Sequence, residues 1–264
     1  MNGLAKGTAL VTGASSGIGA IYADRLARRG YDLILVARGR DRLNDLAKRL
    51  SDSTGRSIEV VVADLTNRED LARVEEILKT DASITMLVNN AGIGAGTPAA
   101  QSDSESMEAM VAINVTAVTR LTHAVLPGFL RRNTGAIINI SSIVAIWPEI
   151  LNGVYAGTKA YVTAFSQSLR NEVAGTGIQV QVVVPGATAT EFWDTAGINI
   201  TSFPAEAVMK ADDLVDAALA GLDLGEFMTI PSLPQYSDWE AYETARKALI
   251  PNISRSTPAA RYRR

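Results

Sequence analysis

The sequence contains no cysteine and a single histidine, His123. Without thiols the chain can form no disulfide, no cysteine-ligated iron–sulfur cluster and no cysteine nucleophile. One imidazole cannot build a metal site that needs several histidines, and it leaves a serine hydrolase only one candidate base. Any chemistry must therefore be carried by Ser, Tyr, Lys, Asn, carboxylates and the backbone.

An excess of charge of one sign is also absent, because 25 Lys and Arg stand against 28 Asp and Glu and leave a net charge of −3. Such a balance provides no general attraction to a nucleic acid backbone. No apolar stretch approaches the roughly 18 residues of a membrane span, and the opening residues MNGLAKGTALVTG lack a secretory pattern. We therefore predict a soluble, cytoplasmic protein that binds neither nucleic acid nor membrane.

Short β-branched segments alternate with longer segments of helical periodicity. The strand segments are nearly continuous apolar runs, which is typical of strands covered by helices on both faces. Each gap is long enough for a crossover helix, so the pattern predicts an α/β fold with a doubly wound, parallel, seven-stranded sheet. The expected strands are Thr8–Thr12, Asp32–Ala37, Ile58–Val62, Ile84–Asn89, Ala136–Ser141, Ile178–Val184 and Glu226–Ile230. The expected helices lie near 17–29, 40–51, 67–79, 103–132, 155–174 and 208–223.

Hydrophobic residues make up 47% of the chain and charged residues 20%, which suits one globular domain over residues 1–264. Two parts depart from the alternation. The stretch near 191–210 carries Phe192 and Trp193, and we interpret it as a flap over a substrate site. Residues near 231–264 form a C-terminal extension that ends in an arginine-rich tail. That tail is either solvated or a contact between subunits.

The segment TGASSGIG at 12–19 joins the first expected strand to the first expected helix. Its glycines, Gly13, Gly17 and Gly19, would let the backbone approach a pyrophosphate, which then binds the N-terminus of the helix. The position between strand and helix supports a dinucleotide site, and a simple tight turn is the alternative.

The end of the second strand is where dinucleotide-binding proteins read the adenosine ribose, and an acid there would repel a 2′-phosphate. This sequence has no acid at that point and continues with Arg38. A guanidinium can bind a 2′-phosphate and stack on adenine, although Arg38 could also be a surface residue.

Tyr155 and Lys159 are four residues apart in a helical segment, so they share one helix face. An ammonium beside a phenol favours the phenolate and lowers its pKa, which makes the tyrosine a usable acid or base. A strand upstream ends at Ser141 and Ser142, whose hydroxyls could bind a substrate carbonyl. Asn114 lies inside a helical segment, where an amide is not favoured by propensity.

Together these segments resemble the short-chain dehydrogenase/reductase family with its TGxxxGxG and YxxxK motifs. The resemblance rests on TGASSGIG at 12–19, Asp64, NNAG at 89–92, Asn114, Ser142, YAGTK at 155–159 and PGATAT at 185–190. It implies a Rossmann-type fold and hydride transfer between a nicotinamide cofactor and a carbonyl or alcohol group.

The resemblance also implies a role for each of four catalytic residues. Tyr155 gives or takes the proton at the substrate oxygen, and Ser142 orients and polarises that oxygen. Lys159 binds the nicotinamide ribose and lowers the pKa of Tyr155, while Asn114 holds a water that links Lys159 to solvent. Ser142 is preferred over Ser141 because its spacing to Tyr155 resembles that of the family.

For the cofactor, the resemblance implies NADP(H) rather than NAD(H), a preference that rests on Arg38 alone. Thr188 stands where the family often has an aliphatic residue, and its role stays open. The implied cofactor-binding residues are Gly13, Ser15, Ser16, Gly17, Ile18, Gly19, Arg38, Asp64, Leu65, Asn90, Ala91, Gly92, Tyr155, Lys159, Pro185, Gly186, Thr188 and Thr190.

The expected substrate wall is apolar, and it favours an apolar carbonyl or alcohol compound over a phosphorylated sugar. The wall consists of Ile143, Trp147, Leu151, Phe192 and Trp193. The same side chains could instead pack the flap or an interface in the homodimer or homotetramer that the family resemblance implies.

Two other functions are alternatives to this one. A dinucleotide-binding redox sensor without turnover is the main alternative, but it has no need of the acid that Tyr155 supplies. A serine hydrolase would depend on His123, and neither Ser141 nor Ser142 stands in a G-x-S-x-G turn. We expect His123 to be a structural helix residue.

Overall fold

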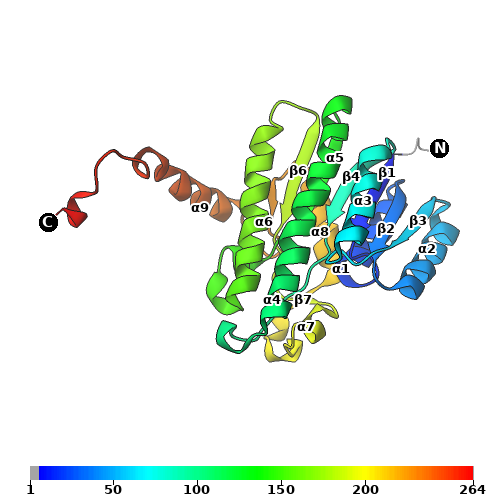
Figure 1. The fold of residues 1–264 in the computed structure, drawn as a ribbon, viewed down its shortest axis with the longest axis horizontal. Coiled ribbons are helices and arrows are strands. Elements are labelled where there is room, and N and C mark those ends of the chain that lie inside the picture. The colour runs from blue at the N-terminus through cyan, green and yellow to red at the C-terminus, as the bar shows by residue number, and fades with distance from the viewer. Residues whose placement is uncertain (1–5, 264) are drawn as a thin grey trace. The chain divides into compact units, whose positions relative to one another are not determined.

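The computed structural model describes residues 6–263 and confirms the predicted seven-stranded parallel sheet (Figure 1). The strand order is β3-β2-β1-β4-β5-β6-β9, and every neighbouring pair is parallel. The order reverses between β1 and β4, which is where open α/β sheets form a ligand crevice. The strands are β1 Thr8–Thr12, β2 Asp32–Ala37, β3 Ile58–Val62, β4 Ile84–Asn89, β5 Gly135–Ile140, β6 Ile178–Val183 and β9 Met228–Thr229.

Helices cover both faces of the sheet. In Figure 1, α5 and α6 lie in front of the sheet and α8 lies behind it; α3 packs against α5, and α1 packs against α8. The helices are α1 Gly17–Arg28, α2 Arg40–Thr54, α3 Arg68–Thr80, α4 Ser104–Val111, α5 Val118–Arg132, α6 Gly153–Glu172, α7 Phe192–Thr195, α8 Ala211–Asp223 and α9 Tyr236–Ala248. A π-helical segment, Ala112–Ala117, joins α4 to α5.

The run from Ser104 to Arg132 is long and apolar enough to pass a length-and-hydropathy test for a membrane span. Its inner side, however, packs against α3 and the strands β4 and β5. We therefore interpret it as a core helix of the α/β fold, whose apolar stripe is used inside the protein.

Local capping explains where the structure departs from the expected boundaries. Helix α6 begins two residues before the predicted start, because Asn152 Oδ1 accepts the N–H groups of Val154 and Tyr155. Strand β5 ends at Ile140, so Ser141 lies just beyond it. Two short strands, β7 Thr188–Ala189 and β8 Met209–Lys210, pair with each other and were not predicted.

The chain divides into two compact units, Met1–Pro231 and Ser232–Arg264. The first holds the sheet, the expected flap and all predicted site residues. The second coincides with the expected C-terminal extension and contains α9, a helix that the sequence pattern did not indicate. Arg264, one of the arginines of the tail, lies outside the described residues.

Candidate active site

The turn between β1 and α1 is built around glycines that other residues could not replace. Gly13 and Gly17 have φ values of 66° and 52°, in the left-handed region that favours glycine. A Cβ at Gly13 would lie 2.8 Å from Asn90 Nδ2, and one at Gly19 would overlap the Gly13 carbonyl oxygen. The unpaired N–H groups of the first turn of α1 follow directly. Ser15, Ser16 and Ile18 are half-buried in the same turn.

The loop after β2 lies next to this turn. The Ala14 N–H donates to the Val36 carbonyl at 3.2 Å and fixes the turn against the end of β2. Arg38 follows with an exposed side chain. Burial raises the pKa of Asp64, but hydrogen bonds from Thr66 and the charge of Arg38 outweigh burial and hold that pKa below its ordinary value. Arg38 and Asp64 therefore belong to one electrostatic environment.

The loop after β4 is bonded to the end of β1, on the other side of the glycine turn. Asn90 Nδ2 donates to the Thr12 carbonyl at 2.9 Å. The backbone N–H groups of Asn90 and Ala91 both donate to Thr12 Oγ1 at 3.0 Å. These bonds hold the loop against the end of β1, at the switch point of the sheet. Leu65, from the loop after β3, is buried.

The loop after β6 approaches both the segment after Ser142 and the glycine turn. The Pro185 carbonyl accepts the Ile143 N–H at 2.9 Å, which ties this loop to the segment after Ser142. The Thr190 methyl group would lie 3.3 Å from a Cβ at Gly17 in the glycine turn. Gly186 is half-buried between them along the chain.

The two adjacent serines after β5 face different environments. Ser141 donates to the Lys159 carbonyl at 2.9 Å, and its Oγ lies 2.8 Å from Thr163 Oγ1. Ser142 is hydrogen-bonded to the Tyr155 phenol. Of the two hydroxyls, the one beside the candidate acid is therefore the one that the family spacing favoured. Ser141 instead fixes the backbone of α6 at Lys159.

Tyr155 and Lys159 lie on one face of α6, and each side chain keeps only 6% of its surface exposed. Lys159 Nζ donates to the carbonyl of Ile140, the last residue of β5, at 2.9 Å. The same nitrogen lies 5.9 Å from the centroid of the Tyr155 ring. The phenol and the ammonium thus share one buried space at the carboxyl end of β5.

Burial moves the pKa values of both groups. It raises the pKa of Tyr155 to about 12, against a smaller opposing contribution from the Ser142 hydrogen bond. It lowers the pKa of Lys159 to about 8, because the charged ammonium is removed from water. From the sequence alone we expect the ammonium to lower the pKa of Tyr155. In the structure that expectation is wrong in direction, since loss of hydration dominates.

Asn114 lies in the π-helical segment Ala112–Ala117 and is 1% exposed. Its Oδ1 accepts the Ile93 N–H at 3.0 Å, and its Nδ2 donates to the Ile93 carbonyl at 2.8 Å and to Thr158 Oγ1 at 3.0 Å. A Cβ at Gly92 would lie 2.9 Å from Oδ1. Both amide hydrogens are used, and Oδ1 keeps the capacity to accept one more bond.

The expected flap carries an aromatic side chain onto this buried group. The Phe192 ring centroid lies 5.8 Å from that of Tyr155. Phe192 and Leu151 pack on a small apolar cluster around Tyr155 that also includes Met110 and Val144. Met110 and Val144 were missed, because isolated apolar residues in a helix and a turn carry no signal of a site.

The other residues of the expected wall lie elsewhere. Trp147 is 58% exposed, and Ile143 is half-buried outside the cluster around Tyr155. Trp193 is buried within the flap, where its indole N–H donates to the Thr188 carbonyl at 2.7 Å. That bond gives Thr188 a structural role that the sequence did not indicate: it anchors the flap at β7.

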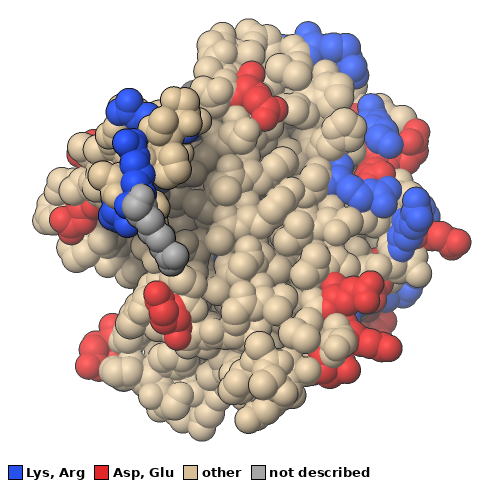
Figure 2. All heavy atoms as spheres, turned by 60° about the vertical axis from the view of Figure 1, so that its left-hand side comes forward, with Lys and Arg blue, Asp and Glu red and all other residues tan. Residues whose placement is uncertain are grey.

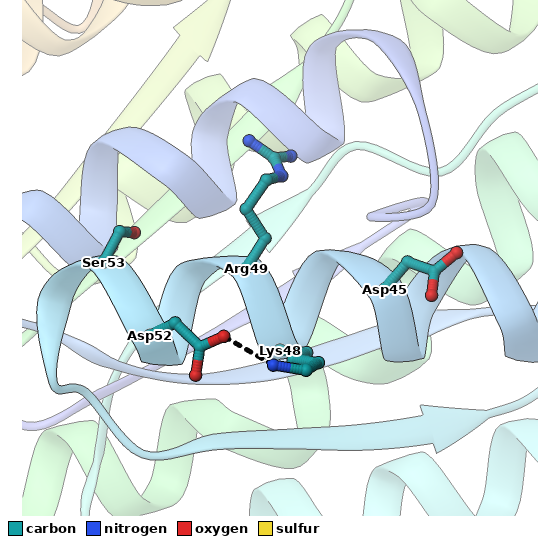
Figure 3. A pocket seen from close by; sticks show the side chains of 5 residues that line it. All are labelled: Asp45, Lys48, Arg49, Asp52 and Ser53. Carbon is teal, nitrogen blue, oxygen red and sulfur yellow. Dashed lines mark hydrogen bonds and ion pairs between the residues drawn. The ribbon is translucent and has the colours of Figure 1, made fainter.

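The hollow drawn in Figure 3 lies away from these residues. It is formed by Asp45, Lys48, Arg49, Asp52 and Ser53, all on the exposed face of α2. Lys48 and Asp52 pair across one helical turn at 2.7 Å. This is a solvated charged helix face, and it contains no predicted site residue.

The residues of the crevice fit a nicotinamide dinucleotide. At one end the glycine turn leaves space that a Cβ would fill, and an exposed guanidinium stands at the end of β2. At the other end are a buried phenol and an amine that can bind a ribose. A hydrolase arrangement does not fit, because His123 is exposed on α5 and the hydroxyl of Ser142 is bonded to Tyr155.

Comparison with known proteins agrees with this architecture. A model of the short chain dehydrogenase family matches residues 7–199. The chain is 48% identical to a short-chain dehydrogenase from Sphingobium yanoikuyae whose structure was solved in complex with NADPH, with a TM-score of 0.94 over 97% of this chain and 100% of that one.

A second solved structure is that of the bulky-bulky ketone specific alcohol dehydrogenase from Comamonas testosteroni, 43% identical with a TM-score of 0.91 over 98% of this chain and 99% of that one. An oxidoreductase of Staphylococcus saprophyticus is 34% identical over 81% of this chain and 90% of its own. The chain therefore belongs to the short-chain dehydrogenase family, whose members are oxidoreductases that bind a nicotinamide cofactor.

Proposed function

We propose that the protein is an NADPH-preferring oxidoreductase that interconverts bulky apolar ketones and the corresponding alcohols. The observation that carries the proposal is the buried group of Ser142, Tyr155 and Lys159 beneath an apolar cluster. A non-catalytic redox sensor would have no use for a phenol kept protonated and dry beside a hydroxyl.

The preference for NADPH rests on Arg38. Its guanidinium is exposed at the end of β2, where it can form charge-assisted bonds to a 2′-phosphate. The carboxylate of Asp64 stands in the same electrostatic environment, so a bound phosphate depends on Arg38 to offset that negative charge. The relative from Sphingobium yanoikuyae that holds NADPH supports the same preference.

In the proposed reaction the bound nicotinamide supplies or accepts the hydride. Tyr155 donates a proton to the carbonyl oxygen during reduction, and its raised pKa keeps it protonated at neutral pH. Ser142 holds the same oxygen through its hydroxyl. Lys159 binds the nicotinamide ribose, and Asn114 holds a water on the remaining acceptor position of its amide oxygen, so that protons reach Lys159 from solvent.

The apolar surroundings of Tyr155 support an apolar substrate. Leu151, Phe192 and Met110 offer hydrocarbon and ring surface beside the phenol. Burying apolar substituents there would supply binding energy in proportion to the area removed from water. The relative named for bulky-bulky ketones supports substituents of this kind on both sides of the carbonyl.

We also propose that the protein works in the cytoplasm as a homodimer or homotetramer. The run from Ser104 to Arg132 exposes Val111 and Leu130, and the C-terminal unit exposes several more large apolar side chains. These are Tyr236, Tyr242, Leu249, Ile250, Ile253 and Tyr262. Figure 2 shows uncharged surface among the Lys, Arg, Asp and Glu side chains of its view. Exposed apolar side chains of this kind suit association with another copy. Light scattering after size-exclusion chromatography tests the assembly.

The first test of function is a parallel titration with NADPH and NADH, followed by nicotinamide fluorescence. We expect clearly tighter binding of NADPH, and then NADPH-dependent reduction of an aryl alkyl ketone. Equal or tighter binding of NADH would overturn the cofactor preference. Binding of NADPH without turnover of any ketone would support the sensor instead.

A further inference from the structure

The loop after β4 contains two glycines that receive side chains of the flap. A Cβ at Gly94 would overlap the Phe192 ring, and one at Gly96 would overlap Ile198. The Gly96 N–H also donates to the Ala196 carbonyl at 3.0 Å. Neither glycine has a positive φ, so these residues are not needed for a turn. Because both glycines lack a side chain, Phe192 and Ile198 of the flap pack directly onto them. We call this stretch, residues 94–96, the seat.

Hydrogen bonds from Asn114 and Asn152 hold the seat in place. On one side Asn114 bonds both the N–H and the carbonyl of Ile93. On the other side Asn152, which caps α6, donates to the Thr97 carbonyl at 2.6 Å and to Ser102 Oγ at 3.1 Å. The short stretch between Ile93 and Thr97 is therefore tied to the same elements that carry Tyr155.

The flap is held differently. Its two ends meet in the small β7–β8 sheet, where Thr188 pairs with Met209 and Ala189 with Lys210. Between these ends it contains short helical turns whose outer residues are mostly exposed. A segment whose two ends are joined and whose middle makes few buried contacts can move as a hinged lid. Little packing is lost when such a segment opens.

Phe192 is held between the seat and the catalytic phenol. One side of its ring meets Gly94, and its centroid is 5.8 Å from that of Tyr155. The ring thus packs beside the Tyr155 ring, and only 6% of the Tyr155 surface is exposed. A ketone with two large substituents needs space next to Tyr155, and the seated ring takes part of that space.

We propose that the contact between Phe192 and Gly94 is the size gate of the substrate site. This inference rests on the proposed ketone reductase function. In the seated position Phe192 admits only small substituents beside Tyr155, and a bulky substrate binds when the ring leaves Gly94 and the flap turns about β7–β8. Gly94 and Phe192 are thereby specificity-determining residues that act as a pair.

The flap carries its own reporter of this motion. Trp193 is buried, lies 5.4 Å from Phe192 between ring centroids, and lies 5.1 Å from Phe203. The chain has three tryptophans. Trp147→Phe and Trp239→Phe therefore leave Trp193 as the sole tryptophan in the full-length protein, which can be excited apart from the tyrosines. Its quenching by acrylamide measures opening of the flap without any need for turnover.

The test compares Gly94→Ala, Phe192→Ala and the double variant in that background, with NADPH and two ketones, butan-2-one and 1-phenylpentan-1-one. Phe192→Ala should raise the ratio of kcat/KM for the bulky over the small ketone about tenfold. Gly94→Ala should shift it in the same direction, because the added methyl group overlaps the seated ring and forces it off Gly94, and should at least double acrylamide quenching of Trp193. The added methyl group meets no ring once Phe192 is gone, so the double variant should match Phe192→Ala.

Phe203→Leu is the matched control, since Phe203 contacts Trp193 but belongs to neither Gly94 nor the cluster around Tyr155. It should leave the ratio unchanged within twofold. Additive effects of Gly94→Ala and Phe192→Ala, or an unchanged ratio in Phe192→Ala, would overturn the gate. If the unaltered enzyme reduces neither ketone, the proposed function fails, while Trp193 quenching in Gly94→Ala still decides whether Phe192 is seated.

Discussion

The two ends of the proposed site for cofactor and substrate are built in opposite ways. At the end proposed for adenosine, here the adenosine end, the protein offers backbone N–H groups, glycines and an exposed guanidinium on Arg38. At the end proposed for the chemistry, here the reaction end, it offers four polar side chains that are almost fully buried, with 1% of Asn114, 9% of Ser142 and 6% each of Tyr155 and Lys159 exposed. The first end is ready for a charged ligand, and the second is covered by the flap.

The difference shows that the two ends use charged and ionisable groups in different ways. An exposed charge such as Arg38 is screened by water and acts mainly by recognition. A buried phenol and a buried amine lose hydration, and their pKa values move to about 12 and about 8. Substitutions at the reaction end should therefore change chemistry and pH dependence, whereas substitutions at the adenosine end should change the choice of cofactor.

The largest expected effect is that of Tyr155→Phe. Removal of the acid should lower kcat for ketone reduction about 10²- to 10⁴-fold, the usual contribution of general acid catalysis. NADPH binding should remain, because the ring is kept. Tyr161→Phe is the matched control on the same helix, since the Tyr161 hydroxyl bonds Thr119 Oγ1 at 2.8 Å. A Tyr155→Phe enzyme with near-normal rates would remove Tyr155 from the reaction.

Lys159 should make the stability of the protein depend on pH. Its pKa falls from 10.5 to about 8 on folding, so between these values the unfolded chain binds more protons. The free energy of unfolding should therefore rise with pH from about 8 to about 10, by roughly 3 kcal/mol at most. Tyr155, with a pKa raised from 10.0 to about 12, acts in the opposite direction above pH 10.

Urea unfolding of the protein and of Lys159→Met, at pH 7.5, 9 and 10, measures this contribution. The stability difference between the two should move in favour of the unaltered protein as pH rises, because the cost of the buried charge is then removed. A difference that stays constant over this range would mean that Lys159 keeps its ordinary pKa in the folded state.

At the adenosine end, Arg38→Asp should shift the preference from NADPH toward NADH by about 10- to 100-fold in the ratio of kcat/KM. The estimate corresponds to one charge-assisted bond of about 1.5–3 kcal/mol. Arg49→Asp, on the exposed face of α2, carries the same change of charge outside the crevice and should leave the ratio unchanged. If both variants shift the ratio equally, overall charge and not a local contact sets the preference.

The smallest expected effect is that of Tyr22→Phe, in the helix α1 that follows the glycine turn. The Tyr22 side chain is fully buried, burial raises its pKa, and its hydroxyl has no hydrogen-bond partner among the described residues. Tyr22→Phe should therefore leave stability unchanged or raise it by up to about 1 kcal/mol. Tyr161→Phe removes a bonded hydroxyl and should lower stability by a similar amount. Thermal unfolding that shows a loss in Tyr22→Phe would reveal a partner for that hydroxyl.

The same contrast explains what the sequence could predict. The sheet follows from continuous apolar strands, and the adenosine end follows from glycines whose backbone conformations are local, as at Gly13 and Gly17. Ser142, Tyr155 and Lys159 could be assigned by resemblance because helix periodicity and strand ends fix their positions.

The contacts that hold the flap over Tyr155 could not be predicted from the sequence. The seat at Gly94 and the anchoring of Trp193 by the Thr188 carbonyl arise from contacts between segments distant in sequence. The direction of the Tyr155 pKa was also missed, because hydration depends on what packs above the phenol. Neither property is encoded by spacing along the chain.

The π-helical segment Ala112–Ala117 has a consequence for how insertions and deletions in this helix are interpreted. A π turn contains one residue more than an α turn. A chain that lost one residue here could continue as a regular helix, with α4 and α5 still presenting the same faces to the sheet. If the lost residue is Asn114, the amide that bonds the Ile93 backbone is lost with it. In an alignment of relatives, a one-residue gap that falls on Asn114 is thus as informative about the reaction end as a replacement of that residue.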